Sequence, residues 1–130
     1  MWEWQLSDSE LATVQQQGAR IRLHLPAASA RALGQPAGAP PSDWGYALGV
    51  ALDLVEPRVQ QWDPHALGRI AQGTLHLDGQ LLTYLPLPGS GQGATELVLR
   101  FANGAALQLL AQAWQCRFVA EARFRESYAC

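Results

Sequence analysis

The chain has 130 residues, of which 48% are hydrophobic and 15% are charged, and its formal net charge is −2. These values describe a folded globular protein and give no electrostatic basis for binding nucleic acid or an anionic membrane. All nine basic residues are Arg, which excludes chemistry that needs a lysine, such as Schiff-base formation. A chain of this length is expected to form one domain, residues 1–130, without disulfide or metal support.

The N-terminal sequence MWEWQLSDSE lacks the basic flank and apolar run of a signal peptide. No segment approaches the roughly 18 uncharged apolar residues that a membrane span needs. Two cysteines, Cys116 and Cys130, are too few for a disulfide framework or a metal site. We therefore expect a cytoplasmic bacterial protein with both thiols reduced.

The first twenty residues carry mixed signals. Trp2 and Trp4 alternate with polar residues, which predicts a short strand with both indoles on one side. Ser7-Asp-Ser-Glu10 then has the spacing of a helix capping box, which predicts one helical turn over Asp8–Leu11. The next segment, Thr13–Gln17, is expected to be a strand that turns at the glycine after it.

The middle of the chain alternates between strands and loops. Arg20–Leu25 has apolar and polar residues in strict alternation and predicts a half-buried strand, as does Tyr46–Val55. Leu33–Gly45 is rich in Pro and Gly and predicts a long surface loop. Glu56–Gly68 is expected to be irregular, with one helical turn after Asp63-Pro64.

Two dipeptides, Asp78-Gly79 and Asn103-Gly104, predict hairpin turns because both tolerate positive φ. In the second hairpin a three-residue loop places Leu99 opposite Leu107 and Leu97 opposite Leu109, so that the apolar side chains share a face. This arrangement puts Gly104 in the left-handed conformation. The positions expected to be buried have odd numbers in this hairpin and even numbers after it. This change predicts a bulge near Leu110–Ala113.

These elements predict a mainly β fold, an antiparallel sandwich or partly closed barrel of about eight or nine strands, with at most one or two short helical turns. The runs from Thr13 and from Thr74 each lead through a strand and a loop to another strand. This similarity is compatible with an internal duplication of residues 10–55 and 70–118, although matches of this kind also arise by chance in β-rich chains.

No catalytic motif is found. His24 and His76 lie at outward strand positions and His65 lies in a loop, so no set of metal ligands can be assembled. Gly89–Gly93 resembles a phosphate loop but leads into a strand, which indicates a linker. Cys116 shares its parity with Trp114 and Phe118, which is typical of a core thiol and not of a nucleophile. Asp53 and Glu56 are expected to be solvated.

The one excess in the composition is aromatic, with five Trp residues. Trp114 is expected in the core. Trp44 and Trp62 fall in the two irregular segments, where with Tyr46 they could line a cleft or a partner surface. The alternative is that they cover the ends of the sheets. Trp2 and Trp4 are candidates of the same kind.

The sequence therefore favours a non-catalytic protein that works by binding a protein partner or by forming a homo-oligomer. The interaction residues would be Trp44, Tyr46, Trp62, Trp2 and Trp4, with no catalytic residue, cofactor or metal. The alternative is a small-molecule carrier with an apolar cavity, and the third possibility is an enzyme of unknown type. A large internal pocket would favour the carrier, and an exposed apolar patch would favour the interaction module.

Overall fold

A computed structural model describes residues 2–33 and 44–126, and within them the chain forms ten strands and no helix. Their bounds are β1 Trp2–Leu11, β2 Thr13–Gln17, β3 Arg20–Ala32, β4 Gly45–Val55, β5 Arg58–Trp62, β6 Gly68–Leu77, β7 Gln80–Leu82, β8 Leu85–Leu87, β9 Gly89–Phe101 and β10 Ala106–Glu126. The predicted mainly β, antiparallel fold is confirmed.

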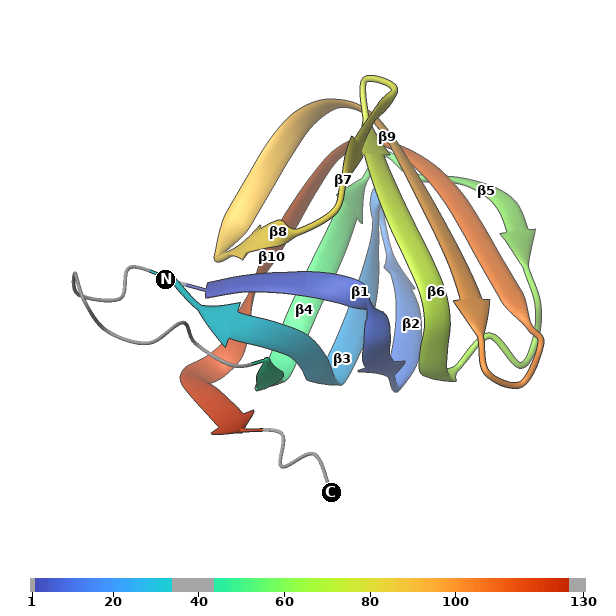
Figure 1. Cartoon of the computed structure of the whole chain (residues 1–130). Coiled ribbons are helices and arrows are strands. Elements are labelled where there is room, and N and C mark those ends of the chain that lie inside the picture. Colours follow the sequence, from blue (N-terminus) through green and yellow to red (C-terminus); the bar gives the residue numbers. More distant parts are fainter. Residues whose placement is uncertain (1, 34–43, 127–130) are drawn as a thin grey trace.

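Six of the strands form a closed antiparallel barrel, in the order β1, β3, β4, β10, β9, β6 and back to β1 (Figure 1). The other four strands extend this barrel, because β2 pairs with β3, β5 with β10, β7 with β6 and β8 with β1. Closure removes most of the exposed strand edges that an open sheet would leave. Free edges remain on the short added strands.

A bulge in β1 allows the barrel to close. Pairing between β1 and β3 shifts between Gln5 and Glu10, and Asp8 within this interval has φ 66°. Beyond the bulge, β1 pairs with β6 at Glu10↔Arg69 and at the next residue along. The predicted helical turn over Asp8–Leu11 is therefore wrong, because a bulged strand occupies these residues.

A second irregularity bends three neighbouring strands at the same level. Pro26 in β3 and Gly49 in β4, which has φ 75°, lie opposite each other between the pairs Leu25↔Val50 and Ala27↔Leu48. The pairing of β10 with β4 also shifts here, between Phe118 and Arg123. Since proline lacks an N–H and glycine accepts positive φ, these residues turn a corner of the barrel with little backbone strain.

The predicted hairpin register is confirmed. Leu99 pairs with Leu107 and Leu97 with Leu109, and Gly104 in the connecting loop has φ 88°. The pairing of β9 with β10 shifts between Ala111 and Ala113, where the sequence predicted a bulge. Asp78 and Gly79 both have positive φ at the turn between β6 and β7, as their dipeptide predicted.

Two segments predicted to be irregular are strands. Gly89–Gly93 is the first part of β9 and pairs with β10, so the linker interpretation is wrong. Residues 58–62 within the predicted irregular connection form β5, which pairs with β10 as well. After β5, one turn is closed by a hydrogen bond from Ala66 N to Asp63 O (3.0 Å), and no helix forms there. The predicted loop Leu33–Gly45 lies mostly outside the described residues.

The barrel interior is filled by alternate apolar side chains, as the periodicity of two predicts. The apolar side chains at alternate positions of β3 from Ile21 to Leu25 and of β4 from Val50 to Leu54 are buried, and both Trp4 and Trp114 lie in the same core. The core also contains Ile21, Leu23, Leu25, Val50, Leu52, Leu54, Ile70, Leu75, Leu97, Leu99, Phe101, Leu107 and Leu109.

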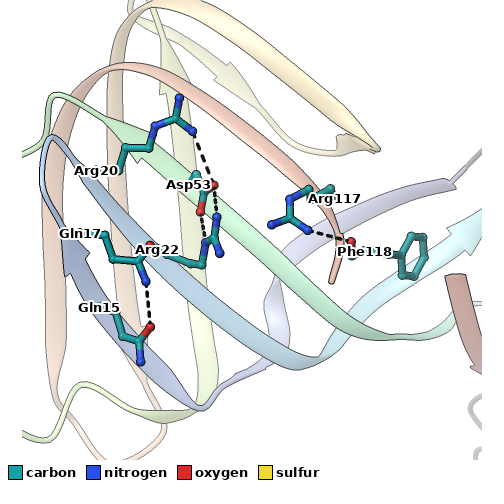
Figure 2. A network of polar contacts seen from close by, with 7 residues as sticks. All are labelled: Gln15, Gln17, Arg20, Arg22, Asp53, Arg117 and Phe118. Carbon is teal, nitrogen blue, oxygen red and sulfur yellow. Dashed lines mark hydrogen bonds and ion pairs between the residues drawn. The ribbon is translucent and has the colours of Figure 1, made fainter. Parts of the chain in front are cut away.

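One buried charge lies on the outer face of the wall. Asp53 in β4 is 2% exposed and accepts two hydrogen bonds from Arg22 in β3, at 2.7 and 3.0 Å (Figure 2). Arg20 approaches the same carboxylate to 3.9 Å. The hydrogen bond and the charge of Asp53 raise the pKa of Arg22 above its usual value. Asp53 was expected to be solvated, but the arginines of the neighbouring strand cover it.

We predict that Gly91→Ala destabilises the barrel, because a Cβ at this position would lie 2.9 Å from Cε2 of the buried Trp114 indole and closer still to Nε1. Since both the indole and the strand are fixed by their neighbours, we expect the free energy of unfolding to fall by about 1–3 kcal/mol. Urea unfolding followed by tryptophan fluorescence measures this change.

The matched control is Ser90→Ala, one residue away on the exposed side of the same strand. That change should alter the unfolding free energy by less than about 0.5 kcal/mol. Equal effects of the two substitutions would mean that Gly91 does not pack on Trp114 as described.

Candidate functional site

The aromatic residues singled out in the sequence lie in different parts of the structure. Trp4 is completely buried in the barrel core. Trp44 directly precedes β4 and Tyr46 is its second residue, and both line one surface depression. Trp62 ends β5 and lines another. The structure therefore brings Trp44 and Tyr46 together and keeps Trp62 apart from them.

The first depression, called here the Trp62 groove, lies between β2 and the end of β5. Its volume is about 350 Å³, and it is lined by Ala12, Thr13, Val14, Gln15, Trp62, Pro64 and Leu67. Trp62 is 40% exposed, Leu67 is 42% exposed, and the nearby Val59 of β5 is 48% exposed. These three residues are large apolar side chains that folding leaves uncovered.

Strand β5 is unusual because all five of its residues are exposed, on both faces of the strand. Within the described residues it pairs only with β10, so its second edge carries no partner strand. Asp63 donates its N–H to Ala106 of the β10 side (3.1 Å). Because backbone groups alternate in direction along a strand, the neighbouring N–H and C=O of Trp62 point toward the free edge.

The second depression, called here the Trp44–Tyr46 cleft, has a volume of about 320 Å³ and is lined by Gln5, Asp8, Ser29, Trp44, Gly45, Tyr46 and Arg69. The strand register explains this grouping, because Gln5 pairs with Ser29 and Ser29 pairs with Tyr46 across β1, β3 and β4. Gln5 Nε2 donates to Ser29 Oγ at 3.2 Å. The three side chains therefore form one polar row on the outer wall.

A second group of side chains, beside the polar row just described, holds Trp44 in place. The Arg31 guanidinium lies 4.8 Å from the centre of the Trp44 ring and 5.3 Å from that of Tyr84. The two rings are 5.4 Å apart. Arg31 also forms an ion pair with Glu3 on the neighbouring strand. Cation–π contact and ion pairing together fix the indole on the barrel wall.

The far side of the cleft is formed by an ion pair. Asp8 Oδ1 lies 3.2 Å from Arg69 Nη2, and both side chains are largely exposed. Asp8 is the residue with positive φ in the β1 bulge. Ser9 supports the bulge, since its buried hydroxyl donates to Gln5 O at 2.7 Å and accepts from Ser29 N at 2.9 Å.

The remaining candidates are part of the barrel packing. Trp4 Nε1 donates to Cys116 Sγ at 3.4 Å, and neither side chain reaches the surface. Trp2 is half-buried and packs edge-on against Phe118, with ring centres 6.5 Å apart. Trp4 therefore cannot contact a partner molecule, and only the exposed part of the Trp2 side chain could do so.

Groups that could perform catalysis are scattered in the described part of the chain. His24, His65 and His76 lie on β3, after β5 and on β6. Among residues 2–33 and 44–126, no group of three or more His, Cys, Asp or Glu side chains could hold a metal ion. Burial raises the pKa of Cys116 to about 11, and a hydrogen bond from Trp4 offsets only part of this shift. The thiol is thus protonated at neutral pH, as its predicted core position requires.

Sequence reasoning missed several residues that line these two depressions or contact their aromatic side chains. Leu67 and Val59 lie in the segment predicted to be irregular, and the two glutamines between Val59 and Trp62 leave no apolar alternation that would have indicated a strand. Arg31, Tyr84 and Asp8 had no local signal that could have linked them to Trp44. Their proximity depends on barrel closure.

No family model, curated protein or solved structure matches the chain. The described residues include no helix that could cross a membrane. Arguments about function therefore depend on the geometry of the two depressions.

We predict that Cys116 resists thiol reagents in the native protein, because the thiol is buried and its pKa is raised to about 11. The measurement uses the Cys130→Ser variant, so that Cys116 is the only thiol that can be labelled. Labelling at neutral pH should be at least about 100-fold slower than in the urea-unfolded chain, because a shift of two pKa units alone lowers the thiolate fraction by this factor. Similar rates in both states would contradict the burial of this thiol.

Proposed function

We propose that the protein is a non-catalytic interaction module that binds an extended segment of a partner polypeptide along β5, with Trp62 as the central contact. The observation that carries this proposal is the exposure of β5 on both faces and along one edge. A strand in this state offers backbone donors and acceptors to an added strand. It also offers an indole to the partner's side chains.

The chemistry of the groove favours a polypeptide with alternating apolar residues. Added strands direct every second side chain to the same side, and the groove offers Trp62, Leu67 and Val14 for such contacts. Its other lining residues carry no formal charge. The partner segment is therefore expected to be apolar at alternate positions and to need no particular net charge.

The alternative of a carrier with an apolar cavity has less support. An eight-stranded barrel is just wide enough for side chains to fill its interior, and a six-stranded barrel is narrower. Here the interior positions are occupied by the core side chains. Both depressions described above open to solvent.

The proposal predicts that Trp62→Ala weakens binding of such a segment without unfolding the barrel, because Trp62 is outside the core. Linear peptides selected on the wild-type protein from a random displayed library serve as the probe. Their dissociation constants, measured by calorimetry, should rise by at least about tenfold in the variant, the size expected for a tryptophan at the centre of an interface.

Leu81→Ala is the matched control, because Leu81 is 50% exposed on β7 and does not line the groove. It should leave the dissociation constants unchanged. Bound peptide should also protect the amides of β5 from hydrogen exchange. Equal losses in the two variants, or protection confined to other strands, would refute the proposed binding site.

The size of the free protein in solution separates a foreign partner from a second copy. Sedimentation equilibrium should show a monomer in both the wild type and Trp62→Ala. A wild-type dimer that dissociates in Trp62→Ala would replace the proposed partner with a second copy of this chain.

A further inference from the structure

We infer that the Trp44–Tyr46 cleft is a second binding site and that its ligand is a neutral polyhydroxylated ring, such as a monosaccharide or the terminal ring of a glycan. This site is separate from the Trp62 groove and shares no lining residue with it. Four observations support the inference: the bulge that positions Asp8, the balance of charge, the fixed aromatic wall and the size of the cleft.

The bulge in β1 places a carboxylate where a regular strand would not. Asp8 has φ 66°, a backbone conformation that side-chain-bearing residues seldom adopt. The buried hydroxyl of Ser9 holds this conformation through hydrogen bonds to Gln5 O and Ser29 N. Bulges of this kind commonly redirect a side chain toward a binding site. In this protein the redirected side chain lines the cleft.

The charges around the cleft balance one another. Asp8 pairs with Arg69 at 3.2 Å, and Glu3 pairs with Arg31 beside Trp44. A charged ligand would have to displace one of these pairs. A hydroxyl group is both a donor and an acceptor, so it can donate to the carboxylate and accept from the guanidinium without separating them. The lining therefore suits a neutral ligand with neighbouring hydroxyl groups.

Further polar groups lie along the adjacent row. Gln5 uses its amide nitrogen for Ser29, which leaves its carbonyl oxygen as an acceptor. The Tyr46 side chain follows in the same row and lines the cleft as well. Several hydroxyl groups around one ring could thus be bound at the same time.

The aromatic wall suits the apolar face of a sugar ring. Trp44 contacts both Arg31 and Tyr84, so little side-chain freedom is lost when a ligand packs against the part of the indole that lines the cleft. The cleft volume of about 320 Å³ lies near the lower end of the range of small-molecule sites. One ring fits these dimensions better than a long chain.

The experiment is a titration of the ¹⁵N-labelled protein with glucose, galactose, mannose and N-acetylglucosamine, followed by NMR. At least one sugar should shift the signals of the Trp44 indole and the Arg69 amide with a dissociation constant of about 1 mM or weaker, a range typical of small ligands with few contacts. Methyl glucoside and maltose then distinguish a free sugar from a terminal glycan ring.

Asp8→Asn is the test variant, because asparagine tolerates positive φ and should preserve the bulge. Loss of the negative charge and of one of the two acceptor oxygens should weaken sugar binding about tenfold. Trp62→Ala is the control and should leave the sugar shifts unchanged. Glutamate and arginine, as charged probes, should cause no shift in the cleft.

Three results would overturn the inference. The first is that no sugar shifts the cleft signals at a concentration of about 100 mM, which is well above the expected dissociation constant. The second is that Asp8→Asn binds sugar as well as the wild type does. The third is that a charged probe shifts the cleft signals and the sugars do not.

Discussion

Barrel closure depends on the hydrogen bonds of the Ser9 hydroxyl. This hydroxyl is completely buried, donates to Gln5 O and accepts from Ser29 N, and so bridges the point where β1 leaves its regular pairing with β3. A buried backbone group without a partner is costly, and a bulge necessarily frees such groups. Because Ser9 satisfies two of them, β1 can bend toward β6 and close the ring.

The same Ser-Asp-Ser-Glu sequence explains why the helical prediction for Asp8–Leu11 was wrong. Serine and aspartate bind nearby backbone groups, which favours helix caps but also turns and bulges. Local sequence does not distinguish these uses. The long-range partner Ser29 decides in favour of the bulge. By contrast, the hairpin at Gly104 was predicted to the level of register, because its turn and its apolar alternation are both local.

The glycine-rich start of β9 shows a second limit of local reasoning. Gly89–Gly93 was interpreted as a linker, because a phosphate loop would lead into a helix and this segment leads into a strand. The structure places the Trp114 indole against Gly91 and the Asp78 carboxylate against Gly93. Glycine is needed here because a distant side chain occupies the space of a Cβ, which the sequence alone does not reveal. The candidate sites show the same limit. Trp44, Tyr46 and Trp62 could be chosen from the sequence because of their residue type, but the residues that surround them could not.

The two proposed sites lie on either side of the shortest ladder in the described barrel. Strands β1 and β6 pair only at Glu10↔Arg69 and Leu11↔Gly68. Arg69 lines the Trp44–Tyr46 cleft, whereas Ala12 and Leu67, the chain neighbours of the second pair, line the Trp62 groove. Closure therefore creates both surfaces at once. It brings Arg69 to Asp8, and it sets the end of β5 beside β2, so each surface exists only in the closed barrel.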